Sequence, residues 1–158
     1  MTAVENVTET QAPPILQMEH WTLVSSDMER TKRFYSDVLG GQIIPRDWPP
    51  SVRLGNMTID FFAAVEGEQR PEPGSLGQHY AFRINLDDFD TWIEHIKAHS
   101  VPYRLATHGP QRLSIYVDDP DGYHIELTAA VDDPEVGRRE AEKRGIQRYT
   151  NVAGPQRS

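Results

Sequence analysis

The chain has 158 residues, of which 37% are hydrophobic, and it carries a formal net charge of −8. This length suits one compact domain with a buried core. The negative charge argues against nucleic acid as a partner, because DNA and RNA require a basic face. The absence of cysteine excludes disulfides, thiolate metal sites and a cysteine nucleophile. The first residues lack the basic and apolar regions of a signal peptide. No apolar run approaches the roughly 20 residues that span a bilayer, so we expect a cytoplasmic protein with no membrane partner.

The chain divides into a leader, a body and a tail. Residues 1–14 are polar and contain proline, which predicts a disordered leader. The body covers residues 15–131. In the tail, residues 132–158, an Asp-Pro pair predicts the start of a helix and Gly145 predicts its end, with a loose segment after it.

The body contains an internal repeat. Residues 20–40 (HWTLVSSDMERTKRFYSDVLG) predict a strand, an N-cap at Asp27 and a helix that Gly40 ends. Residues 79–101 (HYAFRINLDDFDTWIEHIKAHSV) predict the same order of strand and helix. Three short strands are predicted after each helix, at about 42–45, 52–54 and 58–65 in the first half and about 103–107, 112–117 and 123–131 in the second.

A Pro- and Gly-rich linker, residues 66–76, lies between the two halves. The body is therefore predicted to consist of two tandem βαβββ units, at about 15–66 and 77–131. This is an α+β fold, and we expect each unit to form a curved half-barrel sheet around a cavity.

The last strands of the two units align without a gap, with IDFFAAVE from residue 59 over IELTAAVD from residue 125. The alignment places Glu126 opposite Asp60 and His79 opposite His20. Each unit therefore carries one imidazole on its first strand and one carboxylate on its last. If both strands direct these side chains into the concavity, they form a nitrogen and oxygen ligand set for a divalent metal with open positions.

These residues resemble the vicinal oxygen chelate superfamily, which includes glyoxalase I, methylmalonyl-CoA epimerase, extradiol dioxygenases, fosfomycin-resistance thiol transferases and bleomycin-resistance proteins. The resemblance covers about residues 15–131, and the motifs that carry it are MEHWTLVSSDMERTKRFYSDVLG, GQHYAFRI and YVDDPDGYHIEL. It implies that His20, His79 and Glu126 are the metal ligands. Fe(II) is the first expectation for the metal, with Ni, Mn or Zn as alternatives. Asp60 stands where the four-ligand isomerases and lyases carry Glu or Gln, so it is a candidate fourth ligand or base.

Two further candidates lie near the expected metal. Tyr116 is a second candidate catalytic residue, in addition to Asp60, because its phenol can hydrogen-bond a substrate oxygen that gains negative charge. A buried Glu126 requires a partner, either a metal or a basic residue. Arg83, on the same strand face as His79, is the basic candidate.

Three other side chains complete the expected substrate-binding set with Arg83. His124 shares a strand face with Glu126 and is a candidate acid or base near the site. Thr22 and Ser114 occupy positions that match substrate contacts of the fosfomycin enzymes. The remaining histidines of the second half are assigned no role.

Four functions remain open, all for a small-molecule ligand. A non-haem Fe(II) dioxygenase is the first expectation, because two histidines and one carboxylate leave positions for substrate and oxygen. A lyase or isomerase of the glyoxalase or epimerase type is the alternative if Asp60 takes part. A thiol transferase of the fosfomycin-resistance type is a further alternative, although Ala106 and Glu135 stand where those enzymes carry basic residues. The fourth is a metal-free binding protein of the bleomycin-resistance type.

The resemblance also bears on assembly. Chains with two such units often complete their barrel across a two-fold axis, so that a site takes one histidine from another copy. The linker at residues 66–76 is long enough to let the units part. We therefore expect a homodimer.

Overall fold

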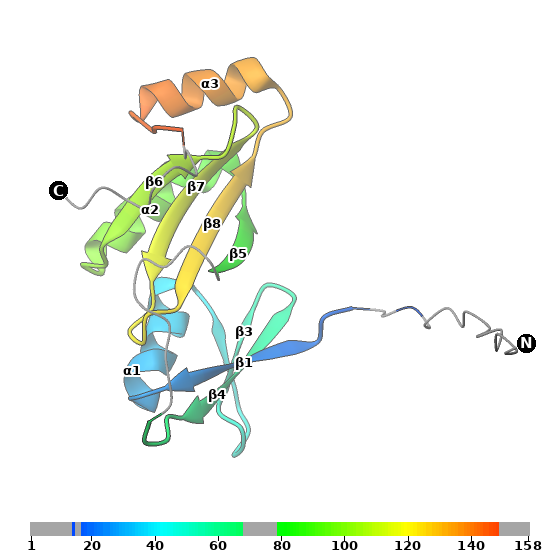
Figure 1. Ribbon diagram of the computed structural model, residues 1–158, viewed down its shortest axis with the longest axis vertical. Coiled ribbons are helices and arrows are strands. Elements are labelled where there is room, and N and C mark those ends of the chain that lie inside the picture. Colours follow the sequence, from blue (N-terminus) through cyan, green and yellow to red (C-terminus); the bar gives the residue numbers. More distant parts are fainter. Residues whose placement is uncertain (1–13, 15–16, 68–78, 149–158) are drawn as a thin grey trace, which may run out of the picture.

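The computed structural model describes residues 14, 17–67 and 79–148, which form two βαβββ units and a third helix (Figure 1). The first, unit one, forms a sheet in the order β1-β4-β3-β2, and the second, unit two, forms a sheet in the order β5-β8-β7-β6. The predicted α+β fold with two repeated units is confirmed. The elements of unit one are β1 (His20–Ser25), α1 (Met28–Arg33), η1 (Phe34–Val38), β2 (Gln42–Ile44), β3 (Ser51–Leu54) and β4 (Met57–Ala63). Those of unit two are β5 (His79–Ile84), η2 (Leu86–Asp88), α2 (Phe89–Ala98), β6 (Tyr103–Thr107), β7 (Arg112–Asp118) and β8 (His124–Ala130).

The first helix begins where the sequence predicts it. The side chain of Asp27 accepts a hydrogen bond from the backbone N–H of Arg30 at 3.1 Å, which satisfies one of the free amides of the first turn. After α1 the helix continues as the π-helical segment η1, in which the N–H of Leu39 donates to the carbonyl of Phe34. Gly40 then ends the helix with a φ of +70°, a conformation that costs glycine little.

The strand register confirms that the two units are equivalent. In unit one β1 runs parallel to β4, and His20 pairs with Thr58, two residues before Asp60. In unit two β5 runs parallel to β8, and His79 pairs with His124, two residues before Glu126. The repeat in the sequence is thus a repeat in register.

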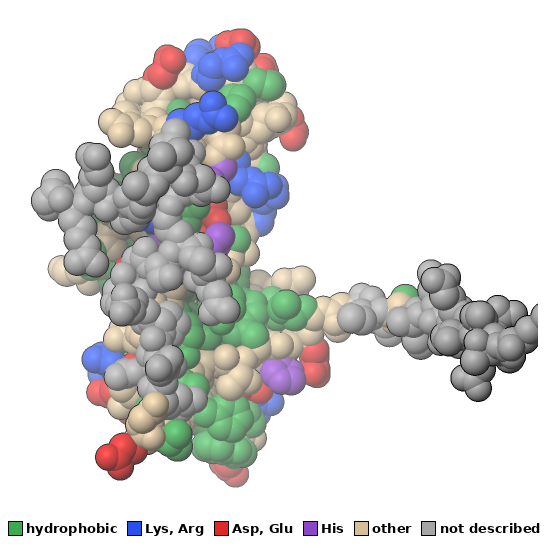
Figure 2. Space-filling model, in the orientation of Figure 1, with side chains coloured by type: hydrophobic (Ala, Val, Ile, Leu, Met, Phe, Trp, Pro, Cys, Tyr) green, Lys and Arg blue, Asp and Glu red, His purple; other side chains and the backbone are tan. Residues whose placement is uncertain are grey.

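Each sheet has an apolar face and a polar face, because successive side chains of a strand point in opposite directions. The apolar faces pack with the helices into one buried cluster that includes Leu23, Ile59, Phe61, Phe89 and Ile125. Figure 2 shows one side of the molecule, with hydrophobic side chains gathered over unit one and histidine side chains visible on both units.

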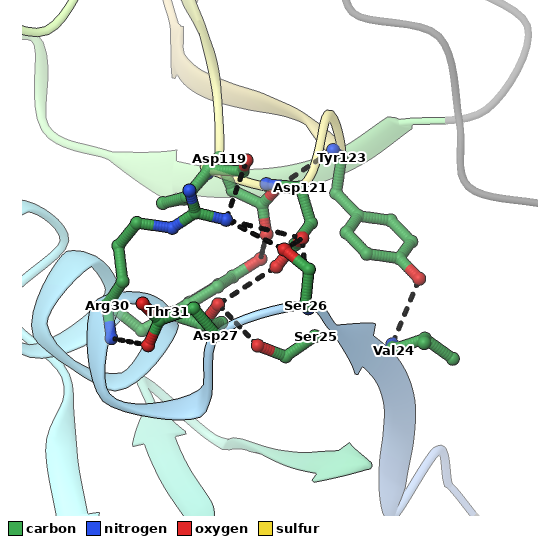
Figure 3. A network of polar contacts seen from close by, with 11 residues as sticks. Val24, Ser25, Ser26, Asp27, Arg30, Thr31, Asp119, Asp121 and Tyr123 are labelled. Atoms are coloured by element: carbon green, nitrogen blue, oxygen red, sulfur yellow. Dashed lines mark hydrogen bonds and ion pairs between the residues drawn. The ribbon is translucent and has the colours of Figure 1, made fainter. Parts of the chain in front are cut away.

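A polar network joins the two units at the turn between β7 and β8 (Figure 3). Asp121 accepts hydrogen bonds from the N–H of Ser26 at 3.0 Å and from the hydroxyl of Thr31 at 3.0 Å. Asp119 accepts a hydrogen bond from the hydroxyl of Tyr35 at 3.1 Å. The turn of unit two is therefore anchored on the first helix of unit one. Across the same junction the rings of Trp21 and Tyr80 stack, with centroids 4.7 Å apart.

The third helix, α3 (Pro134–Lys143), lies at the end of unit two that is remote from unit one (Figure 1). Its N-cap is Asp133, which accepts from the N–H of Glu135 at 2.8 Å, and Gly145 follows its end with a φ of +64°. The helix predicted in the tail is confirmed. The predicted leader, linker and loose tail lie largely outside the described residues, so their boundaries stay predictions. Within the described part of the chain, no helix is long and apolar enough to cross a membrane.

Candidate metal site

The centre of the candidate site is a contact between His79 and Glu126 on the polar face of unit two. The Nε2 atom of His79 lies 3.0 Å from Oε2 of Glu126. Glu126 is on β8, an inner strand of the sheet, and is buried, whereas about a third of the His79 side chain is exposed. The second carboxylate oxygen, Oε1, accepts a hydrogen bond from the hydroxyl of Ser114 at 2.5 Å. The parallel pairing of β5 with β8 thus brings together two of the three predicted ligands.

Tyr116 lies beside this pair on β7, directly opposite Glu126 in the register. Its ring centroid is 6.2 Å from that of His79, and its hydroxyl contacts Nε2 of His108. Burial raises the pKa of Tyr116, and the negative charge of Glu126 raises this pKa further. The phenol therefore remains protonated near neutral pH and can act as a hydrogen-bond donor at the site.

A second cluster of polar side chains lies on the same face of the sheet. It is formed around the pair His124 and Asp118, which lies nearer the turn between β7 and β8 than the pair Glu126 and Tyr116. His124 is buried, and its Nδ1 lies 2.5 Å from Oδ1 of Asp118. The Nη2 atom of Arg104 lies 3.3 Å from Nε2 of His124. The rings of His124 and Tyr116 are nearly parallel, with centroids 5.1 Å apart. His124, which the sequence placed near the substrate, is therefore packed within the site wall.

The equivalent residues of unit one are arranged differently. His20 is exposed, and its Nδ1 lies 3.0 Å from a carboxylate oxygen of the neighbouring Glu19. Asp60 accepts a hydrogen bond from the hydroxyl of Ser51 at 2.7 Å and forms an ion pair with Arg46. Asp60 therefore has a permanently charged partner, Arg46, whereas the basic group beside Glu126 is the imidazole of His79.

The three predicted ligands do not meet within one chain. His79 and Glu126 are in contact, but among the described residues no three His, Cys, Asp or Glu side chains lie close enough to hold a metal ion. The donor set of His79 and Glu126 fits a divalent metal chemically, because one nitrogen and one carboxylate face each other beside two uncharged side chains, Ser114 and Tyr116. A metal ion bound by this pair would need a further ligand from elsewhere.

The other predicted substrate contacts are dispersed. Ser114 lies beside Glu126, whereas Thr22 is exposed on β1, where it pairs with Asp60 in the register. Arg83 pairs with Thr128 and lines a hollow at the end of β5. The partners of Glu126 are His79 and Ser114. Arg83, the basic residue predicted for this role, is not among these partners.

Two sets of polar residues were missed by sequence reasoning. His108 and Arg104 approach Tyr116 and His124 only through the pairing of β6 with β7, so no local motif marks them. No role was predicted for the acidic residues of DDPDG, the turn between β7 and β8. Their number was a usable signal, because a two-strand turn does not need three carboxylates.

The fold and this face define a class of protein, and sequence comparison agrees. Residues 17–127 match the profile of the Glyoxalase/Bleomycin resistance protein/Dioxygenase superfamily. The chain belongs to this superfamily.

Three relatives illustrate the range of similar proteins. The uncharacterized protein YaeR of Escherichia coli is 30% identical over 123 residues, which cover 70% of this chain and 94% of YaeR. The metallothiol transferase FosB of Staphylococcus epidermidis is 28% identical over 72% of this chain and 81% of its own length. A FosX fosfomycin resistance protein of Listeria monocytogenes, solved with Mn(II) and 1S,2S-dihydroxypropylphosphonic acid, superimposes with a TM-score of 0.63 at 22% identity, over 80% of this chain and 99% of that one. At this identity, the FosX structure shows the fold alone.

Proposed function

We propose that the protein is a divalent-metal-dependent enzyme that acts on a small oxygenated molecule. The observation that carries the proposal is the 3.0 Å contact between His79 and buried Glu126. A buried carboxylate is costly unless a cation compensates its charge, and the neighbours of Glu126 are a histidine, a serine and a tyrosine. A divalent metal would supply the missing positive charge, and when bound it would hold two substrate oxygens and stabilise the charge that develops on them.

The third ligand in this proposal is His20 of a second copy of the chain. His20 is exposed on the polar face of unit one, where its side chain contacts the exposed side chain of the neighbouring Glu19. The same unit also exposes Trp48, which packs edge-on against Phe62 with centroids 5.3 Å apart. An exposed tryptophan on the same unit as the exposed His20 supports a homodimer in which unit one of one copy covers unit two of the other.

The polar residues of unit two have distinct tasks in this site. Ser114 holds one oxygen of Glu126, so the other oxygen remains directed toward His79. Tyr116 keeps its proton and can donate a hydrogen bond to a substrate oxygen. His108 contacts the hydroxyl of Tyr116 and thereby orients the phenol.

The environment of Asp60 bears on the reaction class. Its ion pair with Arg46 and its bond from Ser51 occupy the carboxylate, which supports a site of three protein ligands over one of four. We therefore rank the lyase or isomerase reaction below reactions that need three ligands. Similarity to the metallothiol transferase FosB supports transfer of a nucleophile to a chelated substrate as the first choice.

A non-haem Fe(II) dioxygenase is the second candidate. The same two histidines and one carboxylate would suit it, since that ligand set leaves positions for substrate and dioxygen. This was the first expectation from the sequence. The similarity to FosB places it below the transferase.

Metal analysis tests the proposal directly. The purified protein, stripped with a chelator and reloaded with Mn(II) or Fe(II) under anaerobic conditions, should retain about one ion per chain after desalting. Glu126→Gln should remove the bound ion, and the matched control Glu94→Gln, on the exposed side of α2, should retain it. Full occupancy in the Glu126 variant would refute the site.

Two assays then separate the reaction classes. Oxygen consumption by the iron-loaded protein with a panel of vicinal diols would support the dioxygenase. Oxygen-independent loss of thiol in the presence of an epoxide-bearing or other electrophilic oxygenated substrate would support the transferase.

A further inference from the structure

The polar face of unit two carries a cation that the proposed metal site does not use. Arg104 on β6 pairs with Tyr116 on β7, and Tyr116 pairs with Glu126 on β8. The three residues therefore form one row across the sheet. Because neighbouring strands are about 4.8 Å apart, the backbone of Arg104 lies about 10 Å from that of Glu126.

The guanidinium of Arg104 is fixed in place by two aromatic neighbours. Its central carbon lies 5.0 Å from the centroid of the Tyr116 ring, within the range of a cation–π contact. Its Nη2 donates to Nε2 of His124 at 3.3 Å. Because arginine can only donate, this contact requires an unprotonated Nε2, so His124 carries its proton on Nδ1 and donates it to Asp118.

The charge of Arg104 is not neutralised by this arrangement. In the described part of the chain, its contacts are the imidazole of His124 and the ring of Tyr116, and its Nε is buried with no hydrogen-bond partner. Asp118 reaches it only through His124. Arg104 is thus a firmly held cation with no carboxylate partner among the described residues, whereas Arg46 and Arg144 are paired with carboxylates.

We propose that Arg104 binds an anionic group of the substrate. A guanidinium presents a planar fork of donors that matches the oxygens of a carboxylate or a phosphonate. The chain as a whole has a net charge of −8, so a local cation on this face would be needed to attract such a group. The inference rests on the proposed function for the position of the rest of the substrate, whose chelating oxygens would lie at His79 and Glu126.

The substrate class follows from this row of residues. One end of the substrate carries the two oxygens held at the metal ligands, and the other end carries an oxyanion that reaches Arg104. Tyr116 lies between the two ends and can donate to either. A short oxygenated acid, with its carboxylate or phosphonate a few bonds from the chelating oxygens, meets these requirements.

The test uses the full-length protein stripped of metal, so that it does not depend on turnover. Methylphosphonate and acetate are titrated separately while the Nε–H resonance of Arg104 is followed by ¹⁵N NMR, which needs no substitution. We expect a saturable shift of that resonance with at least one of the two anions, and the tighter binder identifies a phosphonate or a carboxylate as the substrate's anionic group. No saturable shift with either anion would overturn the proposal.

Substitutions provide the second measurement. Arg104→Gln should weaken binding of the anion at least tenfold, and Arg104→Lys should weaken it less, because it keeps the charge but loses the fork. The control Arg138→Gln removes the same charge from the exposed side of α3 and should leave binding unchanged. Equal losses in Arg104→Gln and Arg138→Gln would show a general charge effect and refute a site at Arg104.

The outcomes also separate this inference from the proposed function. If metal binding fails but anion binding still depends on Arg104, the metal-dependent function is refuted and the anion site stands. If metal binds through Glu126 but the Arg104 substitutions leave anion binding unchanged, the anion site alone is refuted.

Discussion

Tyr35 donates its phenolic hydrogen to Asp119 over 3.1 Å, across the junction between unit one and unit two. Both side chains are buried, and Asp119 also accepts from the backbone N–H groups of Asp121 and Tyr123 at 2.8 Å each. These donors lower the pKa of Asp119, but burial outweighs them and raises it to about 6. Burial at the junction therefore favours the protonated, neutral form of the Asp119 carboxyl group over its ionised form.

The first prediction concerns this carboxyl group and pH. Because the pKa of Asp119 is raised from its ordinary 3.8 to about 6, the folded protein binds more protons than the unfolded chain between these values. Its contribution to stability is complete below about pH 4 and is lost as the pH rises through 6. Asp119→Asn keeps the shape without the charge, so it should gain stability relative to the wild type as pH rises, by up to about 3 kcal/mol.

Urea unfolding at a series of pH values between 4 and 8 measures this difference. The comparison is made between wild type and variant at each pH, so that other acidic groups cancel. Asp87→Asn, an exposed substitution in η2, serves as the control and should show a difference that does not vary with pH. A pH-independent difference for Asp119→Asn as well would contradict the raised pKa.

The second prediction tests whether a site is shared between two copies. Light scattering should return twice the 18.0 kDa of one chain at micromolar concentration. His20→Ala and Glu126→Ala should each lose the bound metal. When the two variants are mixed and allowed to exchange subunits, one site of each mixed dimer regains all three ligands, so about one quarter of the sites should bind metal.

A site formed within one chain would give a different result. Mixing would then restore nothing, because every chain would carry one defective site. A mixture of His79→Ala with Glu126→Ala is the matched control, since both changes lie in the same unit and no exchange can rebuild the site.

The third prediction concerns Asp60. Its carboxylate is held by Arg46 and Ser51, so Asp60→Asn should leave metal occupancy unchanged and lower turnover by less than about tenfold. If Asp60 were instead a fourth ligand or base, the same change would remove metal or lower turnover by about 10² to 10⁴. Metal content and steady-state kinetics on the same preparation distinguish the two cases.

The fourth prediction concerns the docking of α3. Gly137 is buried in this helix, and a Cβ atom added there would lie 1.5 Å from the carbonyl oxygen of Pro110. Gly137→Ala should therefore destabilise the protein by about 1–3 kcal/mol, although alanine favours helix by itself. Thermal unfolding measures the loss, with Arg139→Ala on the exposed side of the same helix as control. A stabilised Gly137 variant would show that α3 is not seated on this turn.

Much of the fold was predictable because its causes are local. The alternation of side chains in the strands, the Asp27 cap and the glycine at position 40 each act within a few residues, and the structure confirms the elements that they predict. The repeat also made some long-range relationships predictable, since two copies of one sequence pattern imply that both units share one strand register. That register is why the positions of His79 and Glu126 could be matched to those of His20 and Asp60.

The sequence by itself thus determined which residue types occupy equivalent places in two equivalent units, but only the tertiary structure decided how those places differ. His79 meets Glu126, whereas His20 lies at the surface and Asp60 is paired with Arg46. The reason is physical: contacts between side chains depend on what neighbouring strands and turns place beside them. Arg46 comes from outside the strands of unit one, and Arg104 reaches its position through strand pairing. No periodicity or spacing along the chain encodes either contact.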